Sequence, residues 1–299
     1  VAPLASGAIA LLDAAFLREL AHRALPLPPR QRVPESGFVS LDVLRAQGPD
    51  PTGGLPIVCV SHPWLTPEHP DPLGHNLRLV ARALSPLVSG GDASDGAPPR
   101  RVGVFWDFCS LYAWVPGYVQ RLEYEEALYR EGVHAMGAFF AHARTTVFLC
   151  TALPPAYPAG YSRAYGLPAN TAPYAERGWC AAEQAMARLL KSNLRVLDLD
   201  ALPATGSTTT SHLDTLVECS SGAPRPPPQL PSAFERELDH LAFSNGAADR
   251  PLVARLYADT FDATMARAQR LAYGGRSWGD AEAATIAAII ARGKKLSHK

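Results

Sequence analysis

The sequence predicts an α/β protein whose parallel sheet is flanked by helices. The first observation is a set of short apolar runs, rich in Val, Ile, Leu and Phe, which show no clean polar alternation and are therefore typical of strands buried on both faces. These runs lie at residues 57–60, 102–106, 146–150 and 194–199. The second observation is that segments with apolar residues at helical spacing separate the runs. These segments lie at residues 73–84, 118–143 and 174–191. Strand and helix in alternation indicate right-handed βαβ units.

The remaining segments predict a four-part organisation. Residues 1–34 are predicted to form an N-terminal amphipathic helix, over residues 1–20, followed by a linker. The α/β domain is predicted over residues 55–200. A Pro/Ser/Thr-rich linker, 201–231, then leads to a helical C-terminal region, 232–299. Residues 85–100, with adjacent glycines and prolines, predict an irregular insertion. The helices expected after the linker lie at residues 232–243, 250–273 and 280–292.

Composition argues against a nucleic-acid-binding protein and against a membrane-spanning protein. Lys plus Arg and Asp plus Glu both number 28, so the chain lacks the positive field that nucleic-acid binding needs. No apolar run is long enough to span a bilayer, and the start resembles an amphipathic helix rather than a signal peptide. The five cysteines form no C-x-x-C pair, and three lie in or beside predicted strands, which indicates buried thiols in a reducing, cytoplasmic compartment. A start at Val is typical of a processed product or a fragment.

Polar residues follow the predicted strands at the edge where open parallel sheets bind ligands. Ser61 and Trp64 follow the first strand, and Asp107 follows the second. On the helix over residues 174–191, Glu183 lies near the start, on the flank of the apolar face. Burial there raises a carboxyl pKa, whereas the helix N-terminus opposes that shift, and the sequence leaves the balance open.

Other chemistries at this edge have weaker support. Ser61 and His62 are adjacent on a strand and point to opposite faces, which argues against a hydrolytic dyad. His62, His69, Asp71 and His75 fit no common zinc spacing, so no metal is expected. Asp107 has an alternative role as a cap of the following turn, and Glu183 as a solvated helix carboxylate.

Two features carry a resemblance to a known family: the order of the strand ends, and the segment Arg177-Gly178-Trp179-Cys180-Ala181-Ala182-Glu183. With these features, residues 55–200 resemble a divergent Toll/interleukin-1 receptor (TIR) domain. The resemblance implies a flavodoxin-like sheet, a role in signalling and, in its enzymatic members, NAD hydrolysis at the nicotinamide–ribose bond. It makes Glu183 the catalytic residue. Ser61, Trp64, Asp107 and Trp114 are then expected to bind NAD, which is a substrate here, without any prosthetic group.

Two functions remain open after this resemblance. The first is an NAD nucleosidase that becomes active on self-association. The second is a catalytically silent TIR-like scaffold that binds partner proteins, because a fold by itself does not determine an activity. The segment from Trp278 to Lys295 is similar to the opening of a leucine-rich-repeat array, with an ordinary amphipathic helix as the alternative. A flavodoxin-like nucleotide binder is disfavoured because no Gly-rich loop follows the first strand.

Overall fold

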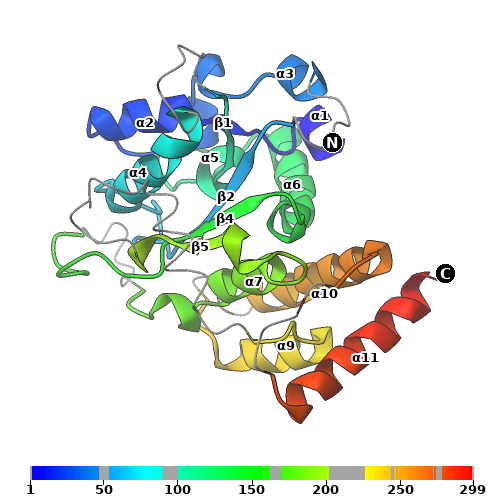
Figure 1. Cartoon of the computed structure of the whole chain (residues 1–299). Coiled ribbons are helices and arrows are strands. Elements are labelled where there is room, and N and C mark those ends of the chain that lie inside the picture. Colours follow the sequence, from blue (N-terminus) through cyan, green and yellow to red (C-terminus); the bar gives the residue numbers. More distant parts are fainter. Residues whose placement is uncertain are drawn as a thin grey trace, which may run out of the picture.

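The computed structural model describes residues 2–46, 54–89, 100–161, 170–201, 226–243, 246, 248–271, 273 and 278–297. Its centre is a five-stranded mixed sheet with the strand order β1-β3-β2-β4-β5 (Figure 1). The strands are β1 (Leu12–Asp13), β2 (Ile57–Ser61), β3 (Gly103–Phe105), β4 (Thr146–Leu149) and β5 (Val196–Asp198). The strands from β2 to β5 pair in parallel, and β1 pairs antiparallel with β3. The predicted α/β class is thus confirmed, but the sheet is mixed rather than purely parallel.

Strand β2 shows why the predicted strands lack polar alternation. Cys59 faces the core on one side of the sheet, whereas Val58 and Val60 face the core on the other side. Both faces of this central strand are therefore buried, as expected for a parallel sheet covered on both sides.

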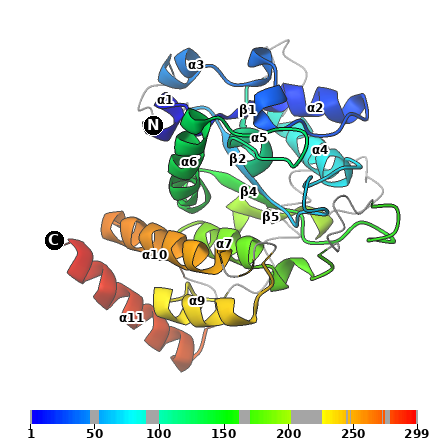
Figure 2. The same ribbon diagram turned by 180° about the vertical axis from the view of Figure 1, so that it is seen from behind.

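Helices cover the two faces in separate groups. The helices α2 (Ala14–His22) and α4 (His75–Ser89) pack together on one face, and α6 (Glu123–Ala141) and α7 (Gly178–Ala187) pack together on the other. Figure 2 shows the same grouping from behind. Short helical segments complete this part of the chain. They are α1 (Ala2–Ala5), η1 (Arg30–Arg32), η2 (Glu35–Gly37), α3 (Leu41–Ala46), α5 (Asp107–Ser110), η4 (Tyr174–Glu176), η5 (Asn193–Arg195) and η6 (Leu199–Ala201).

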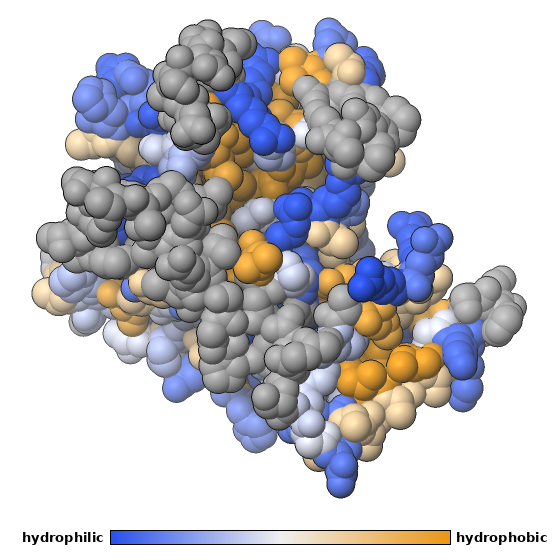
Figure 3. All heavy atoms as spheres, in the orientation of Figure 1, coloured by the Kyte–Doolittle hydropathy of each residue, from blue (hydrophilic) through white to orange (hydrophobic). Residues whose placement is uncertain are grey.

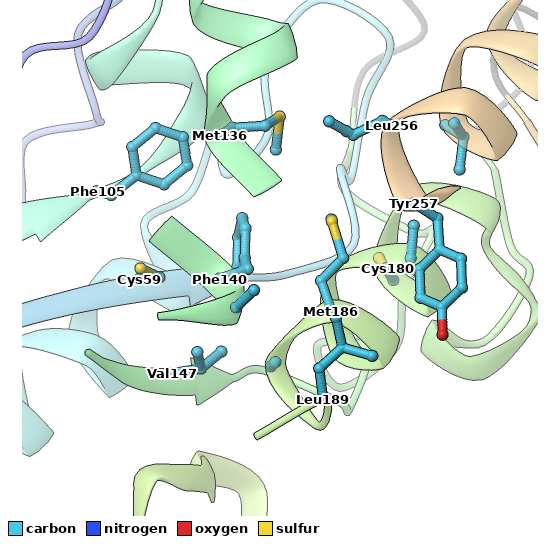
Figure 4. Packing of buried hydrophobic residues seen from close by; sticks show 14 of the residues in the cluster. Cys59, Phe105, Met136, Phe140, Val147, Cys180, Met186, Leu189, Leu256 and Tyr257 are labelled. Carbon is cyan, nitrogen blue, oxygen red and sulfur yellow. The ribbon is translucent and has the colours of Figure 1, made fainter. Parts of the chain in front are cut away.

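The C-terminal region adds a further layer outside α6 and α7. It consists of α9 (Pro231–Glu237), η7 (Leu238–His240), α10 (Asp249–Arg267) and α11 (Asp280–Ser297). Helix α10 packs against both α6 and α7, and α11 packs against α10. Figure 4 shows Leu256 and Tyr257 of α10 facing Met136 of α6 and Met186 of α7. The outer faces of α6 and α7 are therefore part of one continuous core rather than a solvated surface.

The N-terminal segment differs from the single helix predicted over residues 1–20. Gly7 adopts a φ of +78°, which ends the first short helix. Leu12 then pairs with Val104 at the edge of the sheet, and the Asp13 carboxylate accepts a hydrogen bond from the Ala15 N–H at 2.9 Å, which starts α2. Helical spacing of apolar residues therefore masked a two-residue strand whose pairing partner lies far along the chain.

Three further boundaries differ from the predicted ones. Helix α4 continues through Pro86 to Ser89 because Leu87 and Val88 pack on the core beneath it, so part of the predicted insertion is helical. Helix α6 begins at Glu123, since the segment before it contains a turn, and α7 begins at Gly178, after η4. Residues 90–99 and most of the predicted linker, 202–225, lie outside the described residues. Within the described chain, no helix is both long and apolar enough to cross a membrane.

Candidate functional site

The structure brings Ser61 and Glu183 into direct contact at the carboxyl end of β2. The Ser61 hydroxyl donates to Glu183 Oε2 at 2.5 Å, although the two residues are 122 positions apart. Ser61 is the last residue of β2, and Glu183 lies in the second turn of α7, which packs against that strand. The two residues are therefore joined by the topology of the sheet, at the edge where the sequence places both of them.

Tyr174 closes this contact from the loop that precedes α7. Its hydroxyl lies 2.7 Å from Ser61 Oγ and 3.3 Å from the backbone oxygen of Cys180. Because Ser61 uses its single proton on Glu183, Tyr174 is the donor in the bond to Ser61. The three side chains form a hydrogen-bonded chain that is buried throughout, and Glu183 itself is 6% exposed. Glu183 thus does not face an open cleft in this structure.

Burial shifts the pKa of Glu183 upward. Desolvation raises the pKa of this carboxyl well above its ordinary value, and the negative charge of Asp107 raises it further. The hydrogen bond from Ser61 lowers the pKa but does not offset the other two effects. Burial likewise raises the pKa of the Tyr174 phenol well above its ordinary value.

Trp64 and Asp107 form a second pair at the same edge. The Trp64 indole N–H donates to Asp107 Oδ2 at 2.9 Å, and its ring meets that of Phe108 edge to face. The other carboxylate oxygen of Asp107 accepts from the Phe108 N–H at 2.7 Å. Asp107 is the first residue of α5, whose N-cap position is Trp106 without a side-chain hydrogen bond, and its carboxylate joins Trp64 to the start of that helix.

Arg177 connects the loops around this edge, a role that its sequence context does not reveal. Its guanidinium donates to the backbone oxygens of Trp64 at 2.6 Å and Ala172 at 2.8 Å, and it also bonds that of Asn170. The side chain is buried and paired with carbonyls rather than carboxylates. Since any residue can supply a carbonyl, no residue pattern in the sequence marks these partners.

The histidines near this edge have structural partners. His62 Nε2 accepts the indole N–H of Trp106 at 3.1 Å, and burial lowers the His62 pKa, which keeps the ring neutral. Asp71 accepts the N–H groups of His75 and Leu77, each at 2.8 Å, and thereby caps α4. Within the described residues no group of three or more His, Cys, Asp and Glu side chains is placed to hold a metal ion.

Trp114 lies apart from the other predicted site residues. It belongs to the segment between α5 and α6, and 56% of its surface is exposed. A turn follows it, in which the Tyr118 N–H donates to the Val115 oxygen at 3.0 Å and Gly117 has a φ of +71°. In the part of the chain that the structure describes, no hydrogen bond or ring contact joins Trp114 to Ser61 or Glu183.

A hollow of about 400 Å³ lies on the N-terminal side of the molecule rather than at Glu183. Apolar residues of α1, of the segment directly before β1 and of α3 line it, and the buried side chains of Arg30 and Glu125 are at its wall. In Figure 3 apolar side chains gather in this upper part of the molecule, around β1. Arg30 is held there by the backbone oxygens of Gly7, Ala8 and Ser110, so its charge anchors the N-terminal segment to the end of α5.

Comparison of the chain with family models, with curated proteins and with solved structures gives no significant match.

Proposed function

We propose that this chain is a TIR-like signalling domain that acts as a scaffold by associating with further copies of itself. The order of its parallel strands, β3-β2-β4-β5, supports the likeness, because flavodoxin-like sheets begin with the order 2-1-3-4. The position of Glu183 beside the end of β2 supports it as well. In the form described here Glu183 is buried at a closed sheet edge, which favours binding over catalysis.

The observation that carries the scaffold proposal is an exposed aromatic segment, residues 112–124. Four large apolar side chains in this segment are each more than half exposed. They are Trp114 at 56%, Tyr118 at 59%, Leu122 at 59% and Tyr124 at 58%. Isolated exposed apolar residues are ordinary, but a concentration of Trp and Tyr in one segment is typical of the residues that dominate protein interfaces.

The charges beside the segment favour a second copy as its partner. The Arg32 guanidinium lies 5.5 Å from the centre of the Tyr118 ring, and Glu123 is exposed at the start of α6. Two copies related by a two-fold axis present the same surface to each other, so a surface with aromatic rings and both signs of charge is able to match itself.

Measuring molar mass against protein concentration, by light scattering and sedimentation, tests the scaffold proposal. We expect the mass of the wild type to rise with concentration and that of a Trp114→Ser/Tyr118→Ser variant to remain that of one chain. Leu194→Ser is the matched control, since Leu194 is 53% exposed but lies in η5, outside the aromatic segment. A wild type that stays monomeric throughout, or a control that dissociates equally, would reject self-association through this segment.

A second candidate function is hydrolysis of NAD at the nicotinamide–ribose bond, favoured by the Ser61–Glu183 contact at the sheet edge. This bond breaks through an oxocarbenium-like transition state, which a nearby ionised carboxylate stabilises. Nicotinamide leaves as a neutral base, so one carboxylate is sufficient. Glu183 is 6% exposed, so the hydrolase requires the edge to open and expose an ionised carboxylate to NAD.

An NAD-consumption assay, run on dilute and on crowded protein, separates the two functions. The hydrolase predicts NAD loss by crowded wild type that Glu183→Gln abolishes, because glutamine reproduces the neutral carboxyl but cannot ionise. The scaffold predicts no NAD loss by either protein under either condition. Equal NAD loss by both proteins would exclude Glu183 as the catalytic residue.

A further inference from the structure

The segment that closes the sheet edge is itself held by the C-terminal region. Residues Arg177 and Ala242 form a parallel β-bridge. The Ala242 N–H donates to the Glu176 oxygen at 2.8 Å, and the Gly178 N–H donates to the Ala242 oxygen at 3.0 Å. The chain that follows η7 therefore runs as a short strand beside the junction between η4 and α7.

Gly178 is required at this junction for steric reasons. A Cβ atom at this position would come within 1.9 Å of the Phe243 ring, so the ring lies directly against the glycine backbone. The next residue adds a third connection, since the Trp179 indole N–H donates to Asp249 Oδ2 at 3.0 Å, at the start of α10. Backbone, ring and indole contacts thus join three consecutive residues of the junction to the C-terminal region.

The residues on both sides of this junction close the edge around Ser61. Tyr174 precedes it and donates to the Ser61 hydroxyl, whereas Glu183 follows it and accepts from the same hydroxyl. If the junction moves, both ends of the hydrogen-bonded chain must move with it.

We infer that Ala242, Phe243 and Asp249 act together as a latch that keeps the Glu183 edge closed, and that release of this latch opens the edge. Among the described residues, the latch contacts the junction through two backbone hydrogen bonds, the Phe243 ring and one indole hydrogen bond, and Leu241 and Phe243 are only partly buried against the apolar cluster. By contrast, α10 is anchored to α6 and α7 by a wide apolar cluster that includes Leu256, Tyr257 and Phe261. Local release of the latch is therefore a smaller step than detachment of the helix, as expected for sub-global opening.

The latch rests on the proposed function in one respect, because opening matters to the cell only if the edge acts on NAD or binds a partner. The opening itself is measurable without either event. Cys180 provides the probe: it is buried, and its thiol lies 3.5 Å from the His62 oxygen, beside Ser61. Cys59 provides an internal reference, because it is fully buried beneath α6 and needs wider unfolding before it can react.

The experiment measures the rate at which a thiol reagent labels each cysteine of the native full chain, with peptide mass spectrometry to assign the sites. Phe243→Ala removes the ring from Gly178, and we expect Cys180 to react at least about 10-fold faster while Cys59 keeps its wild-type rate, because labelling follows the population of the open form. Asp249→Ala removes the indole hydrogen bond but keeps the Phe243 ring against Gly178, and it is expected to give a smaller change in the same direction. Leu230→Ala is the control, since it removes a half-buried apolar side chain of the same region away from the latch.

Two results would overturn the latch. Either Cys180 keeps its wild-type rate in both latch variants, or Cys59 accelerates in parallel with Cys180, which would indicate general destabilisation. An NAD assay on the same samples separates the proposals: fast Cys180 labelling without NAD loss preserves the latch and rejects the hydrolase, whereas NAD loss without faster labelling does the reverse.

Discussion

Two regions of the molecule carry similar residues in opposite environments. At the Glu183 edge, a tyrosine, an arginine and a tryptophan are buried or half-buried and hydrogen-bonded; these are Tyr174, Arg177 and Trp64. In the exposed aromatic segment two tyrosines and a tryptophan lie at the surface; these are Tyr118, Tyr124 and Trp114. The difference shows that residue type alone does not determine function at the carboxyl edge of this sheet.

Neighbouring contacts account for the difference. The Glu183 edge lies between β2 and α7 and is held by the C-terminal region through Ala242 and Phe243. The aromatic segment follows α5 and turns at Gly117, where the described C-terminal helices do not cover it. We therefore expect matched substitutions in the two regions to affect different properties: stability at the closed edge and association at the open segment.

Arg177→Ala is expected to have the largest effect, a loss of about 3 kcal/mol or more in the free energy of unfolding, since it removes a buried guanidinium and leaves several backbone oxygens unpaired. Urea denaturation measures this loss. Arg130→Ala is the exposed counterpart: the Arg130 side chain is 73% exposed and paired with Glu126, so a change within about 0.5 kcal/mol is expected. Equal losses in the two variants would show that Arg177 does not hold the loops together.

The pH dependence of Glu183 gives the next prediction. Its pKa is raised in the folded chain, so the folded chain retains a proton that the unfolded chain releases above about pH 4.3. The stability contributed by the neutral carboxyl is therefore complete below that pH and decreases as the pH rises toward the folded pKa. Glu183→Gln does not titrate, so the variant should gain stability relative to the wild type as the pH rises above about 4. Parallel pH profiles from urea denaturation would contradict a buried neutral Glu183.

The sequence predicted the framework of the molecule because local signals determine it. Apolar runs mark strands that are buried on both faces, as Val58 and Cys59 illustrate, and the carboxyl ends of such strands share one edge. That rule placed Ser61, Trp64 and Asp107 at one edge, whereas Glu183 was assigned to the same edge from its position on the helix and from the TIR resemblance; the structure joins Ser61 to Glu183 and Trp64 to Asp107.

The features that the sequence did not predict depend on distant partners. Strand β1 has two residues and exists through its pairing with β3. The indole of Trp114 was grouped with the site, but a turn directs that segment to the surface. The latch joins Gly178 to Phe243, and neither residue carries a signal in a single sequence that would pair them. Contacts between backbone groups far apart in the chain leave no pattern of residue types.

A pair of tyrosines offers a direct test of the comparison. Tyr174→Phe removes the hydroxyl that donates to Ser61, and a loss of about 1–2 kcal/mol in unfolding free energy is expected from the unpaired buried group. Tyr118→Phe removes a hydroxyl from a ring that is 59% exposed, so its unfolding free energy should stay within about 0.5 kcal/mol of the wild type. If the two variants lose the same stability, Tyr174 does not close the edge.

A pair of tryptophans gives the smallest expected effect. Trp64→Phe loses the hydrogen bond to Asp107, for which a loss of about 1 kcal/mol is expected, whereas Trp114→Phe should leave stability unchanged within about 0.3 kcal/mol. The order should reverse for self-association, because Trp114 belongs to the exposed aromatic segment and Trp64 does not. Denaturation and light scattering should therefore rank the two variants in opposite order, the first by loss of stability and the second by loss of self-association. If Trp64→Phe weakened association more than Trp114→Phe, the binding surface would belong to the closed edge instead of the aromatic segment.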